Sequence, residues 1–148
     1  MNQEIKVEDV QNYVSKNIKG FHEARLDSLK KLKLDDVLER KNPYLFKAKN
    51  IAVASDLVRG ILDAHISSQE ETLFGNFLED VAIFVNENVY GGWKSTTEGI
   101  DLEFVRDGVR YVVSIKSGPN WGNSSQIKKM KQNFAKAKQL LRQGDKLV

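Results

Sequence analysis

Cysteine is absent from this sequence, and histidine and proline occur only twice each. Without cysteine the chain has no disulfide, no thiolate-bound zinc, no iron–sulfur cluster and no thiol nucleophile. The two histidines are isolated, so a metal bound here would need carboxylate ligands. No apolar run approaches the roughly 18 residues that cross a membrane, and the N-terminus is polar. These absences predict a cytoplasmic protein without a membrane partner.

The residues that are present indicate a folded globular protein of about one domain, because 41% of the 148 residues are hydrophobic and 29% are charged. The charge is distributed unevenly. Residues 67–103 include eight acidic residues and only Lys94 as a basic one, whereas residues 116–148 include eight basic residues and only Asp145 as an acidic one. This asymmetry indicates either surface charges that neutralise each other or a metal site beside a track for a polyanion.

Apolar residues at helical spacing dominate the first ninety residues. They predict two or three short helices over residues 7–40, on either side of Gly20, followed by a break at Asn42-Pro43. They also predict a helix over residues 49–66 that ends at Ser67-Ser68, and another over residues 69–88. After Gly91-Gly92 the spacing changes to the alternation of a strand.

Two alternating segments, residues 100–104 and 109–116, flank Asp107-Gly108 and predict a β-hairpin with a two-residue turn. Counting back from the turn pairs Arg106 with Val109, Phe104 with Tyr111, Leu102 with Val113 and Asp101 with Ser114. One face then carries the apolar side chains, Ile100, Leu102, Phe104, Tyr111, Val113 and Ile115. The other carries Asp101, Glu103, Ser114 and Lys116. We therefore expect two carboxylates and a lysine to converge on one surface.

A polar loop at residues 117–123 precedes a basic helix that we expect to begin with Ser124 or Ser125 as its N-cap and to end near Gln143. This helix has no acidic residue, and its basic residues are Lys128, Lys129, Lys131, Lys136, Lys138 and Arg142. Its apolar face comprises Ile127, Met130, Phe134, Ala137 and Leu141. Residues 145–148 have the pattern of a further strand.

The motif Gly99-Ile100-Asp101, followed by Ser114-Ile115-Lys116, resembles the PD-(D/E)XK nuclease superfamily, in which an Asp and then Glu-x-Lys lie on adjacent strands. Longer segments resemble the PmeII-type family of type II restriction endonucleases, namely KNPYLFKAKN, SSQEETLFGNFLEDVAIFV, GIDLEF and VSIKSGPNWGNSSQI. The resemblance extends over about residues 41–134. It implies an α+β fold with a helical N-terminal region at residues 1–66, a possible dimerisation region, and a partial restriction-endonuclease-like core at residues 67–148.

The resemblance also implies a site-specific deoxyribonuclease of a restriction-modification system, a homodimer that hydrolyses double-stranded DNA with Mg²⁺. Mg²⁺ prefers hard oxygen ligands and activates water near pH 7. The implied ligands are Asp101 and the Ile115 carbonyl, and Lys116 would position water or stabilise charge. Ser114 stands where the superfamily has an acid, so Glu79 is the first candidate to replace that acid, with Glu71 and Glu103 as alternatives.

Donors suited to phosphates and base edges lie in the polar loop and the basic helix. The predicted DNA contacts are Lys94, Asn120, Trp121, Asn123, Ser124, Ser125, Gln126, Lys128 and Lys129. Two alternatives remain open: a non-catalytic DNA-binding module derived from a nuclease fold, and a helical interaction domain with an incidental hairpin. We also expect these 148 residues to be an N-terminal fragment that lacks the last core strand. Such a fragment should bind DNA weakly and cut it slowly or not at all.

Overall fold

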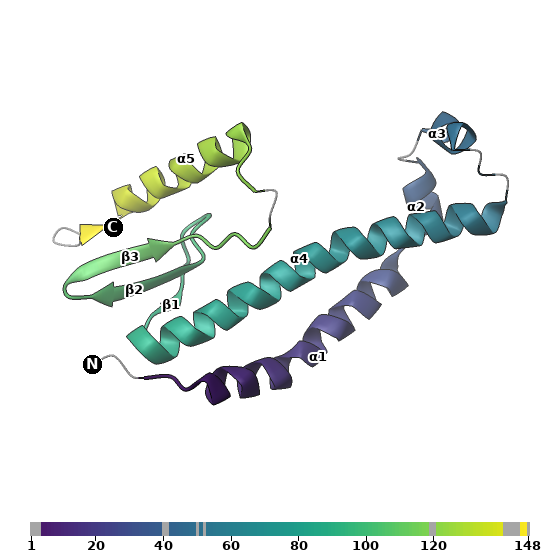
Figure 1. The fold of residues 1–148 in the computed structure, drawn as a ribbon. Coiled ribbons are helices and arrows are strands. Elements are labelled where there is room, and N and C mark those ends of the chain that lie inside the picture. Colours follow the sequence, from purple (N-terminus) through teal and green to yellow (C-terminus); the bar gives the residue numbers. More distant parts are fainter. Residues whose placement is uncertain are drawn as a thin grey trace. The chain divides into compact units, whose positions relative to one another are not determined.

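A computed structural model describes residues 4–39, 42–49, 51, 53–118, 121–140 and 146–147. It has the α+β architecture that the sequence predicts (Figure 1). The chain forms two compact units. The helical unit comprises Ile18–Phe74, and the sheet unit comprises Met1–Asn17 together with Gly75–Val148. The predicted functional division between residues 66 and 67 stays a prediction.

The helical unit contains most of α1 (Val7–Lys31), α2 (Leu34–Glu39), α3 (Pro43–Ala48) and the first part of α4 (Ala54–Tyr90). Side chains of α1 and α4 meet within this unit. The rings of Phe21 and Phe74 are 5.9 Å apart in an edge-on arrangement, and Ser28 Oγ lies 3.0 Å from His65 Nε2. Asn42 caps α3, as its Oδ1 accepts the Tyr44 N–H at 3.0 Å.

Two predicted helix ends are wrong, because α1 continues through Gly20 and α4 continues through Ser67-Ser68. A glycine inside an exposed helix costs about 1 kcal/mol, which lowers helix stability without ending the helix. The Lys19–Glu23 ion pair, at 3.2 Å, bridges the turn that contains Gly20. The two serines are exposed, so their side chains remain solvated within a continuous helix.

The sheet unit holds a four-stranded sheet of β1 (Trp93–Lys94), β2 (Leu102–Arg106), β3 (Val109–Val113) and β4 (Lys146–Leu147), in that order. β1, β2 and β3 pair antiparallel, and β4 pairs parallel to β3. The strand predicted near the end of the sequence is therefore present at Lys146–Leu147.

The predicted hairpin register is confirmed, since Arg106 pairs with Val109, Phe104 with Tyr111 and Leu102 with Val113. The turn explains the register. Asp107 has φ 53° and Gly108 has φ 72°, so both adopt the left-handed conformation that a two-residue type I′ hairpin turn requires.

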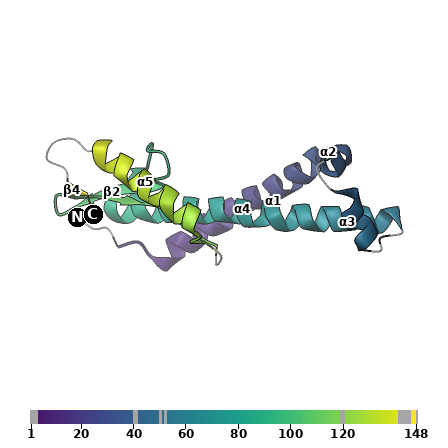
Figure 2. The ribbon, with the colours of Figure 1, turned by 90° about the horizontal axis from the view of Figure 1, so that it is seen from above.

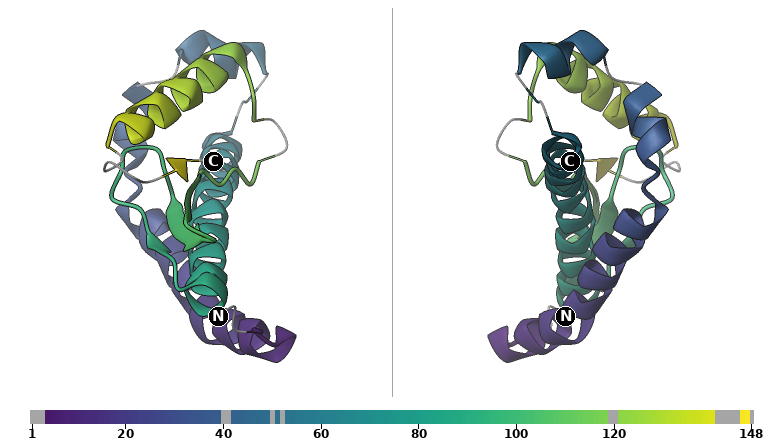
Figure 3. Two further views of the ribbon diagram at one scale, coloured as in Figure 1. Left: turned by 90° about the vertical axis from the view of Figure 1, so that its left-hand side faces the viewer. Right: turned by 90° about the vertical axis from the view of Figure 1, so that its right-hand side faces the viewer.

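Within the sheet unit, helices cover both faces of the hairpin, with the part of α4 from Gly75 on at one side and α5 (Ser124–Leu140) at the other, as Figure 1 and the left view of Figure 3 show. On the α4 side, the Phe104 ring stacks between Tyr90 and Tyr111 at 4.6 and 4.7 Å. On the other side, α5 lies over the strands (Figure 2), and Val112 packs with Ala137 and Phe134 of α5.

One residue lies on the other face from that predicted. Ile100 packs with Val112 and Ala137 rather than with the apolar side chains of Phe104 and Leu102. The reason is that β2 begins only at Leu102, and a turn through Gly99, with φ 76°, redirects the chain just before it. Strand alternation therefore does not extend back to Ile100.

Candidate active site

Asp101 lies at the start of the hairpin, directly before β2, and its carboxylate faces the end of β3. Its Oδ2 accepts the backbone N–H of Ile115 and, at 3.3 Å, the hydroxyl of Ser114. The side chain of Asp101 is 18% exposed. The predicted convergence of Asp101 with Ser114 thus follows from the hairpin register and is held by hydrogen bonds from the segment directly after β3.

Lys116 joins this cluster from the same segment. Its Nζ donates to the Ile115 carbonyl at 2.7 Å and lies 3.6 Å from Asp101 Oδ2. The ammonium therefore contacts both of the oxygen groups that the resemblance implies as metal ligands. The side chain of Lys116 is 39% exposed, so solvent reaches the cluster.

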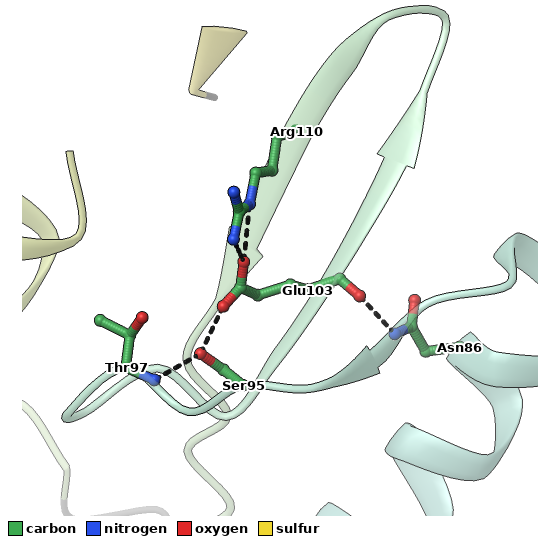
Figure 4. A network of polar contacts seen from close by, with 5 residues as sticks. All are labelled: Asn86, Ser95, Thr97, Glu103 and Arg110. Carbon is green, nitrogen blue, oxygen red and sulfur yellow. Dashed lines mark hydrogen bonds and ion pairs between the residues drawn. The ribbon is translucent and has the colours of Figure 1, made fainter. Parts of the chain in front are cut away.

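Glu103 lies in β2, two residues after Asp101, and has a different environment (Figure 4). Glu103 is 2% exposed. Its Oε2 accepts from Arg110 Nε at 2.8 Å and from Arg110 Nη2 at 2.6 Å, and its Oε1 accepts the Ser95 hydroxyl at 2.6 Å. The Glu103 carbonyl accepts from Asn86 of α4 at 3.0 Å. Both carboxylate oxygens of Glu103 are thus engaged by the protein itself.

The other two acids considered as replacements for the missing carboxylate at Ser114 lie on α4. Glu79 pairs with Lys94 of β1 at 3.2 Å, and its side chain is 26% exposed. The hydrogen bond to Glu79, and then the charges of Glu79, Asp80 and Asp101, raise the pKa of Lys94. Glu71 is exposed and belongs to the helical unit. Lys94 therefore lies within the electrostatic reach of both Glu79 and Asp101.

The cluster can supply oxygen ligands, although the described residues contain no group of three or more His, Asp or Glu side chains arranged to hold a metal ion. Mg²⁺ keeps several of its waters and is commonly bound through only one or two carboxylates. The carboxylate of Asp101 and the carbonyl of Ile115 are therefore oxygen ligands of the kind that suits Mg²⁺. In this structure Lys116 Nζ contacts both groups.

A cavity of about 370 Å³ adjoins the cluster. Ser114 and Lys116 line it from the hairpin, and four predicted DNA contacts, Trp121, Ser125, Gln126 and Lys129, line it from the loop and α5. Sequence reasoning missed three other lining residues, Gly99, Met130 and Asn133, because their proximity arises from packing between distant segments.

The first turn of α5 is capped differently from the prediction, since Asn123 rather than Ser124 or Ser125 is the N-cap. Asn123 Oδ1 accepts the Gln126 N–H at 2.9 Å, and Gln126 Oε1 accepts the Asn123 N–H at 3.2 Å. This reciprocal arrangement is a capping box, whose signal in the sequence is Asn and then Gln three residues later. Ser124 begins the helix, and Lys128 is exposed on it. Asn120 and the predicted helix end near Gln143 lie outside the described residues.

Glu98 forms a contact that the sequence did not predict. It lies in the turn before Asp101, and its carboxylate accepts from Lys129 at 2.9 Å and from Lys136 at 3.1 Å. The hydrogen bonds from these two ammonium groups lower the pKa of Glu98. Two lysines of the basic helix are therefore bound to an acid of the same chain.

A family model described as type II restriction endonuclease EcoO109I matches residues 8–147. The chain belongs to this family. The match spans both compact units and all the candidate site residues. It supports a restriction endonuclease, and hence a site-specific, DNA-binding nuclease, but it does not support the PmeII-type assignment.

No curated protein and no solved structure matches the chain. Within the described residues, no helix combines the length and the apolar character that crossing a membrane requires. The EcoO109I family match and the hairpin cluster are therefore the two observations from which a function is inferred.

Proposed function

We propose that this member of the EcoO109I family hydrolyses phosphodiester bonds in double-stranded DNA with Mg²⁺, and that Asp101 and Lys116 belong to its active site. The observation that carries the proposal is the convergence of Asp101, Ile115 and Lys116 at one end of the hairpin. A PD-(D/E)XK type of site has this combination of a carboxylate and a lysine on adjacent strands.

Each group in the cluster has a distinct role. Asp101 and the Ile115 carbonyl would hold Mg²⁺, which supplies a Lewis acid that neutralises phosphate charge and eases deprotonation of water. Lys116 positions the attacking water or stabilises the charge that develops on the phosphate. The Ser114 hydroxyl and the Ile115 N–H keep the Asp101 carboxylate in place.

Glu79 is the acid that we propose in place of the carboxylate missing at Ser114. Two observations support it. Glu79 pairs with Lys94 at 3.2 Å, and Lys94 in turn lies within the electrostatic reach of Asp101. Glu103, in contrast, is already bound by Arg110 and Ser95.

The DNA would approach from the side of the cavity and α5. Trp121, Ser125, Gln126 and Lys129 line this cavity together with Lys116. Hydroxyl, amide and ammonium donors of this kind contact DNA phosphates and base edges.

We further propose a cytoplasmic homodimer of a restriction-modification system, because cutting both strands of a palindromic site requires two copies related by a twofold axis.

The first prediction concerns Asp101→Ala in the natural full-length enzyme. Cleavage of duplex DNA with Mg²⁺ should fall by roughly 100-fold or more, since even an outer partner of a metal ligand typically contributes 10- to 100-fold. Binding of the same duplex in Ca²⁺ should be retained. Asp107→Asn is the matched control, because Asp107 is 88% exposed in the hairpin turn.

Undiminished cleavage by Asp101→Ala would place the active site elsewhere. Comparison of Glu79→Gln, Glu71→Gln and Glu103→Gln then identifies the replacing acid, which we expect to be Glu79. A wild-type protein that binds DNA but does not cleave it, whichever divalent metal is added, would favour the non-catalytic DNA-binding module. The specific observation for that alternative is Ser114 in place of an acid.

A further inference from the structure

The turn that contains Glu98 and Gly99 docks on one stripe of α5. Glu98 binds Lys129 and Lys136, and Gly99 packs against Asn133, where an added Cβ would lie only 1.8 Å from Asn133 Nδ2. Residues 129, 133 and 136 are separated by four and three positions, so they lie on the same side of the helix. The two lysines thus flank Asn133 along this stripe.

Asn133 has unused hydrogen-bonding capacity. Its side chain is 8% exposed, and its Oδ1 has no hydrogen-bond partner among the described residues. Buried polar groups are normally paired, so such a group calls for a ligand, an ion or a water. Asn133 and Lys129 also line the cavity that contains Lys116 and Ser114, so a ligand at this stripe lies beside the proposed active site.

The Glu98 carboxylate presents to the lysines the same chemistry as a phosphate group. Both are anions whose oxygens accept charge-assisted hydrogen bonds from ammonium groups. Glu98 and both lysines are more than half exposed, so their ion pairs are weak and can exchange partners. A DNA strand entering the cavity would bring a competing anion to the two lysines.

We propose that Lys129 and Lys136 form a binding site for a backbone phosphate of DNA, and that Glu98 occupies this site until a phosphate displaces it. This inference rests on the proposed function, because it takes DNA as the ligand. Glu98 thereby weakens the binding of DNA whose phosphate must displace it from the two lysines.

A double-mutant cycle tests the exchange. Binding of a fluorescent duplex is measured by anisotropy in EDTA, so that cleavage plays no part, for wild type, Glu98→Gln, Lys129→Gln/Lys136→Gln and the triple variant. Lys131→Gln/Lys138→Gln is the matched control, since these exposed lysines of α5 are also seven residues apart. Asp107→Asn controls for the loss of an acid, and thermal unfolding verifies that each variant folds.

Glu98→Gln should raise DNA affinity about 3- to 10-fold at low salt, because a phosphate then no longer has to break two exposed ion pairs to reach the lysines. The gain should fall below about 1.5-fold when Lys129 and Lys136 are glutamine, and should persist in the Lys131→Gln/Lys138→Gln background. Loss of Lys129 and Lys136 should also lower the magnitude of the slope of log affinity against log salt by about 1, because the two lysines bind one phosphate.

An equal gain in all backgrounds would show that Glu98 acts only by long-range repulsion, and would overturn the exchange while leaving the proposed function intact. Failure of the wild-type chain to bind duplex DNA at all would overturn the inference and the proposed function together. A gain of the same size from Asp107→Asn would likewise remove the special role of Glu98.

Discussion

Two acids that the sequence places on one face of the hairpin, Asp101 and Glu103, differ in what they can bind. The contacts described for Asp101 all use Oδ2, and they come from Ser114, Ile115 and Lys116 at the open end of the hairpin. Glu103 is 2% exposed, and both of its oxygens hold Arg110 or Ser95. Position relative to the strand end therefore separates a candidate ligand from a structural carboxylate.

Glu103→Ala should destabilise the protein by about 2–4 kcal/mol, because removal of one partner of a buried ion pair leaves the other charge uncompensated. Because the Arg110 side chain is 27% exposed, the expected loss of stability is smaller than for a fully buried ion pair. Chemical denaturation measures this change.

Calorimetric titration with Mn²⁺ then separates a structural role of Glu103 from a role as a metal ligand, since Glu103→Gln should leave metal affinity within about twofold of wild type. A large loss of metal affinity in a folded Glu103→Gln variant would restore Glu103 as a ligand.

The Asp101, Ser114 and Lys116 cluster could be predicted from the sequence because a two-residue turn at Asp107-Gly108 sets the register of every later pair. The contact of Glu98 with Lys129 and Lys136 could not. These residues are 31 and 38 positions apart, and their meeting depends on how α5 packs across the hairpin. No local pattern carries that information.

Among the elements, α5 begins where the capping box of Asn123 and Gln126 forms. This cap fixes the first turn of the helix, which contains Ser125 and precedes Lys129. Gln126 Oε1 also accepts the Gly122 N–H at 3.0 Å. The cap therefore ties the polar loop to the helix that lines the cavity.

Asn123→Ala should lower the free energy of unfolding by about 0.5–2 kcal/mol, since the first-turn N–H groups of α5 lose their acceptor. DNA affinity should fall as well, because the cap positions Ser125 and Lys129. Asn123→Ser retains an acceptor without adding charge and should recover most of both quantities in denaturation and anisotropy measurements. If Asn123→Ala matched wild type in stability, the cap would not determine where α5 begins.

Element boundaries were harder to predict than element types. Periodicity predicted the helices and the hairpin, but the run of α4 through Ser67-Ser68 and of α1 through Gly20 depends on neighbouring turns that continue the helix. Ile100 changed face for a similar reason, since a turn through Gly99 precedes β2. Local signals of interruption are weak compared with helix propagation and packing.

At the scale of the whole molecule, the helical unit buries little apolar surface. Among those of its residues whose side chains the structure describes, Ile61 is the only buried apolar one. Many large apolar side chains of this unit are exposed: Leu26, Leu34, Tyr44, Leu45, Val53, Val58, Leu62 and Phe74. A cavity of about 340 Å³ lies among Leu45, Ile51 and Leu57. Exposed apolar surface of this kind is typical of protein–protein contacts, which agrees with the predicted dimerisation role of the N-terminal helices.

The last prediction is that the natural protein is a homodimer at micromolar concentration and that the helical unit forms the contact. Leu45→Lys with Val58→Lys should shift the protein toward monomer in sedimentation velocity, because each substitution places a charge in an apolar contact. Val105→Lys is the control, since Val105 is 49% exposed in the sheet unit and should leave the dimer unchanged. In the monomeric variant, cutting of both strands of a palindromic site should become slow relative to nicking of one strand, because a single copy presents one active site. A wild-type protein that sediments as a monomer even with cognate DNA would remove the twofold arrangement from the proposal.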